Sequence, residues 1–162
     1  MRPLTEQETK VLFEKLANYT TDLKPLIAPL SDAPDADRYV FRLIKDRVYY
    51  VLLSIANRMV TLESPRTERI PHARYKIWVK PNGVMPFLYG SHVSKAHVGR
   101  WTEDCPANVG VIVYDMSDSP IGFGVSARST AEARRLDPTG IVVFRQADCG
   151  EYLRDEDTLF AG

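Results

Sequence analysis

The sequence predicts an α+β protein in which a small N-terminal α/β domain with antiparallel strands precedes a compact β-barrel-like module with short helices. Three observations lead to this prediction. The chain starts with the pattern of a capped amphipathic helix, and residues 39–51 show the alternation of a hairpin. After residue 75, several short apolar runs lie between turn residues, as in small barrels.

The composition excludes several classes of protein. The chain has 162 residues, a length that fits one or two domains. Hydrophobic residues make up 44% of it, which is enough to build a core. It contains no apolar run of about 18 residues and no apolar signal core at its start, so we expect neither a membrane span nor secretion. Cys105 and Cys149 lie far apart without a Cys/His cluster, which indicates a reducing compartment and no zinc site.

The first domain is predicted from local patterns. Thr5 and Glu8 form a capping box, and Val11 and Leu16 follow at helical spacing. Residues 39–44 and 47–51 are predicted as the two strands of a hairpin, covered by a helix over 52–59. A polar linker over 61–72 places the boundary near Pro71, which gives an N-terminal domain of residues 1–71 and a second domain of residues 72–162.

The second domain is predicted to contain short strands with two small helices inserted. The expected elements are a strand over 75–80, a turn at 81–83, a short helix over 87–98, strands over 109–114, 121–128 and 141–144, and a capped helix over 129–136.

The strand over 121–128 has two unequal faces. Ile121, Phe123 and Val125 alternate with Gly122 and Gly124, so the larger residues are predicted to face the core and the glycines to face outward. A face with almost no side chains would let a nucleic-acid backbone approach closely. The alternative is that the glycines mark a place where the strand bends or another backbone comes near.

No catalytic arrangement is evident. His92 and His97 are five residues apart on the predicted helix and do not share a face, so they are interpreted as surface or boundary histidines. The sequence lacks a P-loop, a dinucleotide fingerprint and a nucleophile elbow. We therefore expect no catalytic residues, no metal, no cofactor and no small-molecule substrate.

Basic and aromatic residues are the remaining candidates. Arginines lie in one strand-to-helix segment, and two further basic residues flank the preceding helix: Arg128, Arg134, Arg135, Lys95 and Arg100. Arginine suits phosphates and base edges, although the same residues can form an ordinary solvated surface with ion pairs to Glu132 or Asp137. The hairpin aromatics Tyr39, Phe41 and Tyr49 indicate either a stacking surface, a core or a protein interface.

Several separate runs, taken together, resemble the Nip-seven family of nucleolar factors for assembly of the large (60S) ribosomal subunit. These runs are MRPLTEQET at residues 1–9, DRVYYV at 46–51, FLYGSHV at 87–93, IGFGV at 121–125, FRQAD at 144–148 and GEYLR at 150–154.

The resemblance implies an N-terminal α/β domain followed by a C-terminal PUA-type mixed β-barrel. It implies a non-enzymatic factor of the nucleus and nucleolus that acts in pre-rRNA processing and binds uridine-rich single-stranded pre-rRNA. The implied protein partners are pre-60S factors, among them an rRNA cytosine methyltransferase. The implied RNA-binding positions are Arg128, Arg134, Arg135, Lys95, Arg100 and Gly90, and Tyr39, Phe41 and Tyr49 remain candidates for protein contact.

This chain departs from the family pattern between the hairpin and the barrel, where family members are longer. Either this member is naturally shortened or residues of this segment are missing from the chain. A shortened N-terminal sheet would expose an edge that another protein must cover. A protein-interaction adaptor with incidental RNA contact is therefore the alternative function. An RNA-modifying enzyme is a further alternative, for which the chain lacks motifs.

The formal net charge of zero hides an uneven distribution. Residues 73–147 contain nine basic and six acidic residues, whereas residues 148–162 contain one basic and five acidic residues. A mildly basic module followed by an acidic tail permits a local and modest contact with RNA.

Overall fold

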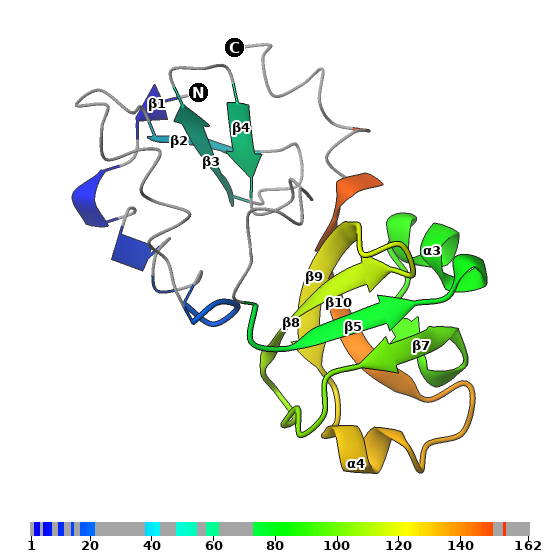
Figure 1. Cartoon of the computed structure of the whole chain (residues 1–162). Helices are drawn as coiled ribbons and strands as arrows, with labels where there is room; N and C mark the ends of the chain where they lie inside the picture. The colour runs from blue at the N-terminus through cyan, green and yellow to red at the C-terminus, as the bar shows by residue number, and fades with distance from the viewer. Residues whose placement is uncertain are drawn as a thin grey trace.

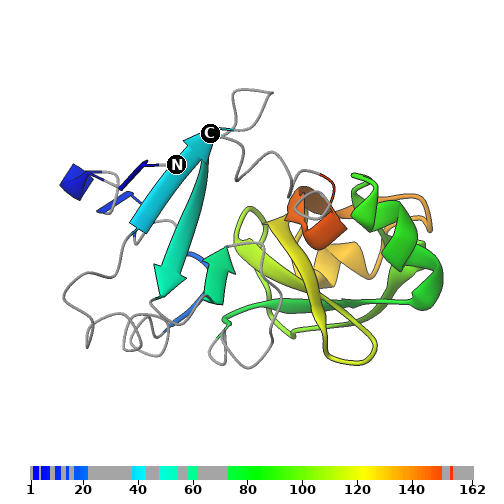
Figure 2. The same cartoon turned by 90° about the horizontal axis from the view of Figure 1, so that it is seen from above.

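The computed structural model describes residues 2–3, 5–7, 10–11, 14, 17–21, 38–42, 48–54, 58–61, 73–150 and 154. These residues form a four-stranded sheet in the N-terminal part and a six-stranded sheet in the C-terminal part. The two sheets are separate in both views (Figures 1 and 2). The predicted α+β class is confirmed. No described helix is long and apolar enough to cross a membrane.

The N-terminal sheet has the strand order β1-β2-β3-β4 with antiparallel neighbours throughout. Its strands are β1 (Arg2–Pro3), β2 (Arg38–Arg42), β3 (Val48–Ser54) and β4 (Arg58–Thr61). The predicted hairpin is confirmed, because β2 pairs with β3. Glu6, Gln7 and Lys10 are helical, in agreement with the helix predicted near the start.

The predicted helix over 52–59 is wrong, because residues 52–54 form the end of β3 and residues 58–59 form the start of β4. Leu52 pairs with Val60 and Leu53 with Met59. A short apolar run fits a helix and a buried strand equally well, so its pattern alone does not decide between them. The predicted turn at residues 45–46 and most of the predicted linker lie outside the described residues.

The C-terminal sheet curls into a nearly closed barrel with the strand order β6-β10-β9-β8-β5-β7 (Figure 1). It is mixed, because β5 and β8 are parallel while the other neighbours are antiparallel. The strands are β5 (Lys76–Val79), β6 (Val93–Ser94), β7 (Val98–Trp101), β8 (Gly110–Asp115), β9 (Pro120–Ser126) and β10 (Ile141–Asp148).

The helices of the barrel differ from the prediction between residues 81 and 98. Helix α3 spans Pro81–Leu88, so the predicted turn at 81–83 is the first turn of a helix. Proline at the first helical position is favourable because its φ is already helical and no amide hydrogen bond is lost there. The predicted helix over 87–98 is wrong: α3 ends, β6 follows, and the 3-10 helix η2 (Lys95–His97) leads into β7.

The faces of β9 from residue 122 onward are the reverse of the prediction, whereas Ile121 is buried in the core as predicted. Gly122 and Gly124 face the barrel interior, where an added Cβ would lie 2.4 Å from the Ala147 carbonyl oxygen and 2.2 Å from the Phe144 carbonyl oxygen. Phe123 and Val125 face outward and are half-buried. The alternative interpretation, glycines at a close approach of another backbone, is therefore the right one. The glycine face is not open to a nucleic-acid backbone.

The outward face of β9 is covered by the end of the N-terminal helical segment. The Tyr19 ring packs edge-on against Phe123, with ring centroids 5.3 Å apart. The Tyr19 hydroxyl donates to Gln146 Oε1 at 2.5 Å, and an added Cβ at Gly110 would lie 2.9 Å from the Tyr19 ring. Burial raises the pKa of Tyr19 to about 12. This contact explains why apolar side chains such as Phe123 face away from the barrel interior.

Candidate nucleic-acid interface

The predicted arginines flank the short helix α4 (Thr130–Ala133): Arg128 precedes it, and Arg134 and Arg135 follow it. The local sequence determines where this helix starts. Ser129 is the N-cap, and its hydroxyl accepts from the Glu132 amide, while the Glu132 carboxylate accepts from the Ser129 amide at 3.1 Å. The predicted capping box is confirmed. These hydrogen bonds, together with the nearby charge of Arg128, hold the pKa of Glu132 below its usual value.

Contacts from distant parts of the chain hold α4 against the barrel. Thr130 donates from its hydroxyl to the Thr102 carbonyl at 3.0 Å, and its amide donates to the Cys105 carbonyl at 2.9 Å. Ala133 is fully buried. The segment that carries the arginines is therefore fixed in place before any ligand binds.

Lys95 holds the end of α4. Its Nζ donates to the Arg134 carbonyl at 2.7 Å and to the Leu136 carbonyl. A cation at this point satisfies carbonyls that have no partner within the helix. Lys95 is half-buried, and two of its three donors are used, so its first role is structural.

The three arginines differ in how available they are. Arg134 forms an ion pair with Glu103, whose carboxylate oxygens lie 2.5 and 2.7 Å from Arg134 Nη2. Arg128 and Arg135 are exposed, and neither forms an ion pair with another described residue. An exposed ion pair such as that of Arg134 contributes little to stability and can exchange for a phosphate. Arg128 and Arg135 are thus the most accessible charges of the segment.

A small pocket lies beside Arg128. It has a volume of about 20 Å³ and is lined mainly by apolar side chains, among them Trp101, Cys105 and Val142. Burial raises the pKa of the Cys105 thiol. The volume suffices for about one water molecule, so the pocket does not fit a nucleotide or another cofactor.

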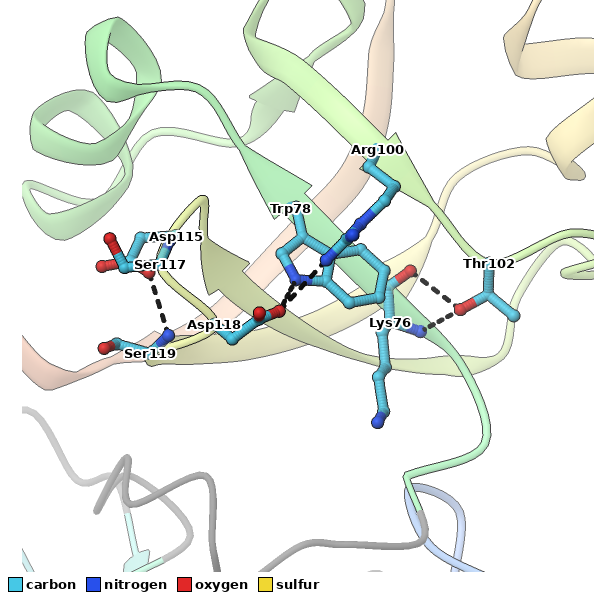
Figure 3. Close-up of polar contacts among 8 residues, drawn as sticks. All are labelled: Lys76, Trp78, Arg100, Thr102, Asp115, Ser117, Asp118 and Ser119. Carbon is cyan, nitrogen blue, oxygen red and sulfur yellow. Dashed lines mark hydrogen bonds and ion pairs between the residues drawn. The ribbon is translucent and has the colours of Figure 1, made fainter.

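Arg100 lies apart from α4, on the outer side of β7. Its guanidinium carbon lies 3.9 Å from the centroid of the Trp78 ring, and its Nη2 lies 3.1 Å from Asp118 Oδ1 (Figure 3). The indole Nε1 donates to the same Asp118 oxygen at 2.6 Å. No described contact joins Arg100 to the α4 arginines.

Gly90 follows the end of α3, which lies at the opposite end of the barrel from α4 in Figure 1. Its φ of +101° favours glycine, because other residues adopt this conformation only with strain. An added Cβ would meet no atom within 4 Å, so space around Gly90 is open. The structure therefore brings together Arg128, Arg134, Arg135 and Lys95, and places Gly90 and Arg100 elsewhere on the barrel.

The hairpin candidates lie on paired strands. Phe41 pairs with Tyr49, and Tyr39 pairs with Val51. Alternate positions of a strand share a face, so positions 39 and 41 lie on one face together with position 49 opposite. Among the strands that the structure describes, β4 is at the edge of this sheet.

Histidines and acidic residues of the barrel make structural contacts. His92 accepts at Nδ1 from the Arg145 amide at 3.1 Å, and His97 Nδ1 lies 3.2 Å from Ser94 Oγ. The fully buried Asp148 pairs with Arg145, whose Nε lies 2.5 Å from Asp148 Oδ2. Within the described part of the chain, no group of three or more His, Cys, Asp or Glu side chains could hold a metal ion.

The sequence patterns did not indicate the role of Trp78 and Asp118. Trp78 lies within the strand predicted over 75–80, and Asp118 lies between two predicted strands, with no functional role expected for either. A signal was present: Arg74, Lys76, Trp78 and Lys80 alternate with the buried Ile77 and Val79, which places basic residues and an indole on one outer face.

Family models cover most of the chain. Residues 1–66 match the "NIP7/UPF0113, pre-PUA domain" model, and residues 75–157 match the "UPF0113 PUA domain" model. The chain is 50% identical over 184 residues to the "60S ribosome subunit biogenesis protein NIP7" of Saccharomyces cerevisiae, with 99% of both chains covered. It is 53% identical to the corresponding Schizosaccharomyces pombe protein, with 99% of this chain and 100% of the relative covered.

The alignment with the Saccharomyces cerevisiae relative spans 184 positions, more than the 162 residues of this chain. That relative therefore has residues with no counterpart here. Among solved structures, a PUA domain from Aeropyrum pernix is similar with a TM-score of 0.62 at 16% identity, covering 97% of this chain and 90% of that one. A PUA domain protein from Thermoplasma acidophilum is similar with a TM-score of 0.61 at 13% identity, covering 94% and 95%. The predicted PUA-type barrel is confirmed.

Proposed function

The chain belongs to the NIP7 family, and from this membership we propose that it is a non-enzymatic, RNA-binding factor for assembly of the large (60S) ribosomal subunit. The curated relatives are named for 60S biogenesis and match this chain over nearly their whole length. The PUA domain supports RNA as the ligand of this chain.

The observation that carries the proposal is the exposed arginine group on α4. Arg128 and Arg135 are exposed and unpaired with other described residues, and Arg134 is held only by an exposed ion pair. Arginine binds phosphates through a planar, permanently charged group with five donors. Because α4 is fixed at both ends, these charges bind RNA without a large ordering cost.

The finer parts of the proposal follow the family resemblance. The RNA is uridine-rich, single-stranded pre-rRNA, and the chain acts in its processing in the nucleus and nucleolus. The protein partners are other pre-60S factors, including an rRNA cytosine methyltransferase. The two functional units are residues 1–71 and 72–162, with RNA bound by the second, and Lys95 and Gly90 support the RNA contact from beside α4 and α3.

The test is RNA binding by the triple variant Arg128→Ala, Arg134→Ala, Arg135→Ala. Fluorescence anisotropy with a uridine-rich 12-nucleotide RNA gives the affinity as a function of salt. For single strands, log K changes with log salt by about −0.7 per phosphate contact, so the triple variant should have a slope about 2 units shallower and a weaker affinity. Arg154→Ala removes an exposed arginine that lies beside α3, away from α4, and is the matched control. Unchanged affinity and slope in the triple variant remove the α4 surface from the proposal.

A second candidate function, a protein-interaction adaptor with incidental RNA contact, is favoured by the N-terminal sheet. At the edge of that sheet, within the described residues, β4 is available for pairing with a strand of another protein. The hairpin positions Tyr39, Phe41 and Tyr49 would form the adjoining contact.

The two functions differ in what the hairpin variants do. Pull-down of a purified pre-60S partner with Tyr39→Ser or Tyr49→Ser, measured beside RNA binding, separates them. Loss of the partner with RNA affinity retained supports the adaptor. Retention of the partner by both variants argues against a hairpin interface.

A further inference from the structure

Three side chains form a row across adjacent strands on the outer face of the barrel. By register, Trp78 of β5 lies between Arg100 of β7 and Tyr114 of β8. The Trp78 and Tyr114 rings are stacked, with centroids 5.6 Å apart and planes at 25°, and the Tyr114 side chain is buried. The Arg100 guanidinium lies over the Trp78 ring, 3.9 Å from its centroid (Figure 3). Burial raises the pKa of Tyr114, and the Asp118 charge adds to this effect.

Asp118 fixes this row in advance of any ligand. Its Oδ1 accepts from both the Trp78 Nε1 and the Arg100 Nη2 (Figure 3). The turn that carries Asp118 is itself held, because Asp115 Oδ1 accepts from the Ser117 and Ser119 amides at 2.8 and 2.9 Å. The guanidinium is thus oriented by an indole beneath it and a carboxylate at its edge.

The opposite face of the guanidinium is open. The Arg100 side chain is 55% exposed although the indole covers one side and Asp118 one edge, so the exposure falls on the outer side. Because Asp118 partly neutralises the charge, this arginine is less suited to a phosphate than those on α4. A planar, weakly hydrated group with one free face is instead suited to stacking with an unpaired base.

The charges around the row favour a nucleic acid over a protein. Lys76 of β5 lies on the same side as Trp78, with its Nζ 5.8 Å from the Tyr114 ring centroid, and Arg74 and Lys80 flank the strand at its two ends. The nearby carboxylates of the β8–β9 turn already have partners: Asp115 accepts from backbone amides of the turn, and Asp118 accepts from Trp78 and Arg100. Basic residues interleaved with an aromatic are typical of surfaces that follow a single-stranded backbone while bases stack.

We propose that the exposed Arg100 guanidinium, backed by the half-buried Trp78 and the buried Tyr114, is a stacking platform on which one unpaired base of single-stranded RNA lies. The proposal rests on the proposed RNA-binding function and adds a second contact, distinct in chemistry from the α4 arginines. Lys76 and Lys80 provide the neighbouring positive charges for the backbone of that RNA.

The test is Arg100→Lys, which keeps the positive charge and removes the planar guanidinium group. Its matched control is Arg74→Lys, the same change at an exposed arginine just before β5. Binding of the full chain is measured by anisotropy with a uridine-rich 12-nucleotide RNA and with an RNA of equal length whose central residues are abasic. Thermal melting of each variant verifies that the fold is retained.

We expect Arg100→Lys to weaken binding of the intact RNA by about fivefold or more, as for loss of one stacked base. The slope of log K against log salt should not change, because the charge is kept. The abasic RNA should bind Arg100→Lys and the unchanged chain equally, and Arg74→Lys should bind both RNAs as the unchanged chain does.

Other results overturn the platform. Equal affinity of Arg100→Lys and the unchanged chain for the intact RNA rejects stacking and leaves a protein as the occupant of this face. An equal loss on intact and abasic RNA assigns Arg100 to phosphate contact only. If either result accompanies weaker binding by the α4 triple variant, the platform fails while the proposed function stands. If the unchanged chain binds no RNA, both fail.

Discussion

Tyr19 joins the N-terminal segment to the barrel, and Tyr19→Phe tests that junction with a minimal change. The substitution removes the hydroxyl that donates to Gln146 Oε1 at 2.5 Å. It keeps the ring that packs edge-on against Phe123. Any change in stability is therefore attributable to the hydroxyl alone.

At neutral pH, the expected loss is the net value of one neutral hydrogen bond, about 1 kcal/mol. The Gln146 amide is exposed and can turn to water, so no large penalty for an unsatisfied group should add to this. Tyr19→Phe should therefore lower the free energy of unfolding by about 1 kcal/mol at pH 8.

At alkaline pH, the difference should shrink. Burial raises the pKa of Tyr19 from 10.0 to about 12 in the folded chain, so the unfolded chain loses its phenol proton first. Stability linked to this group is fully present below pH 10 and is lost as the pH rises toward 12. Between these two pKa values, the free energy of unfolding falls by up to about 1.4 kcal/mol for each pH unit. Because the ring is partly exposed, we expect a loss of about 1 kcal/mol between pH 10 and pH 11. Tyr19→Phe has no such loss, so both proteins should be about equally stable at pH 11.

The assay is urea unfolding of both proteins at pH 8, 9, 10 and 11, followed by tryptophan fluorescence. Titration of the other tyrosines is common to both proteins and cancels in the difference. A constant difference from pH 8 to pH 11 would show that Tyr19 is not desolvated. Equal stability at pH 8 would show that the hydroxyl makes no useful contact with the barrel.

Three further predictions concern the barrel. Gly122→Ala should lower the free energy of unfolding by about 1–3 kcal/mol in urea titrations, because its Cβ would overlap a carbonyl oxygen of β10, and an unchanged midpoint would contradict this packing. Lys95→Met should lower the free energy of unfolding by about 1 kcal/mol and leave the salt dependence of RNA binding unchanged. Arg135→Ala, in contrast, should make the slope of log K against log salt about 0.7 units shallower. A shallower slope for Lys95→Met would show that Lys95 contacts a phosphate instead. Ser129→Ala should lower the free energy of unfolding by about 1 kcal/mol at pH 7, because the helix loses its N-cap. The cap lowers the pKa of Glu132, so the stability that this carboxylate provides is present above its usual pKa of 4.5 and is lost as the pH falls below that value. A difference between the two proteins that does not depend on pH would reject this linkage.

Features determined by neighbouring residues could be predicted from the sequence. The Ser129 capping box, the β2–β3 hairpin and the apolar strand β8 each depend on residues within a few positions of one another. The faces of β9 could not be predicted in this way. Alternation shows that two faces differ, but which of them is inside depends on Tyr19, more than a hundred residues earlier in the chain.

The same limit applies to the candidate RNA site. The arginines around α4 lie together in sequence, so their proximity was predictable. Whether each charge is free was not, because the partners are distant: Glu103 for Arg134, and Asp118 for Arg100. Lys95 is the clearest example, because nothing in the neighbouring sequence indicates that its ammonium group donates to two carbonyls at the end of a helix.

This distribution of paired and free charges explains how a chain with no net charge can bind RNA. Of the basic residues in the barrel, several are occupied by carboxylates or carbonyls of the barrel itself: Lys95, Arg100, Arg134 and Arg145. If phosphate contact is limited to the three arginines around α4 together with Lys76 and Lys80, the slope of log K against log salt for single-stranded RNA should be near −3.5, at about −0.7 per contact. A slope near −6 would require many more phosphate contacts than these side chains provide. Affinity beyond a shallow electrostatic contribution must then come from contacts that salt does not weaken, such as a base stacked on Arg100.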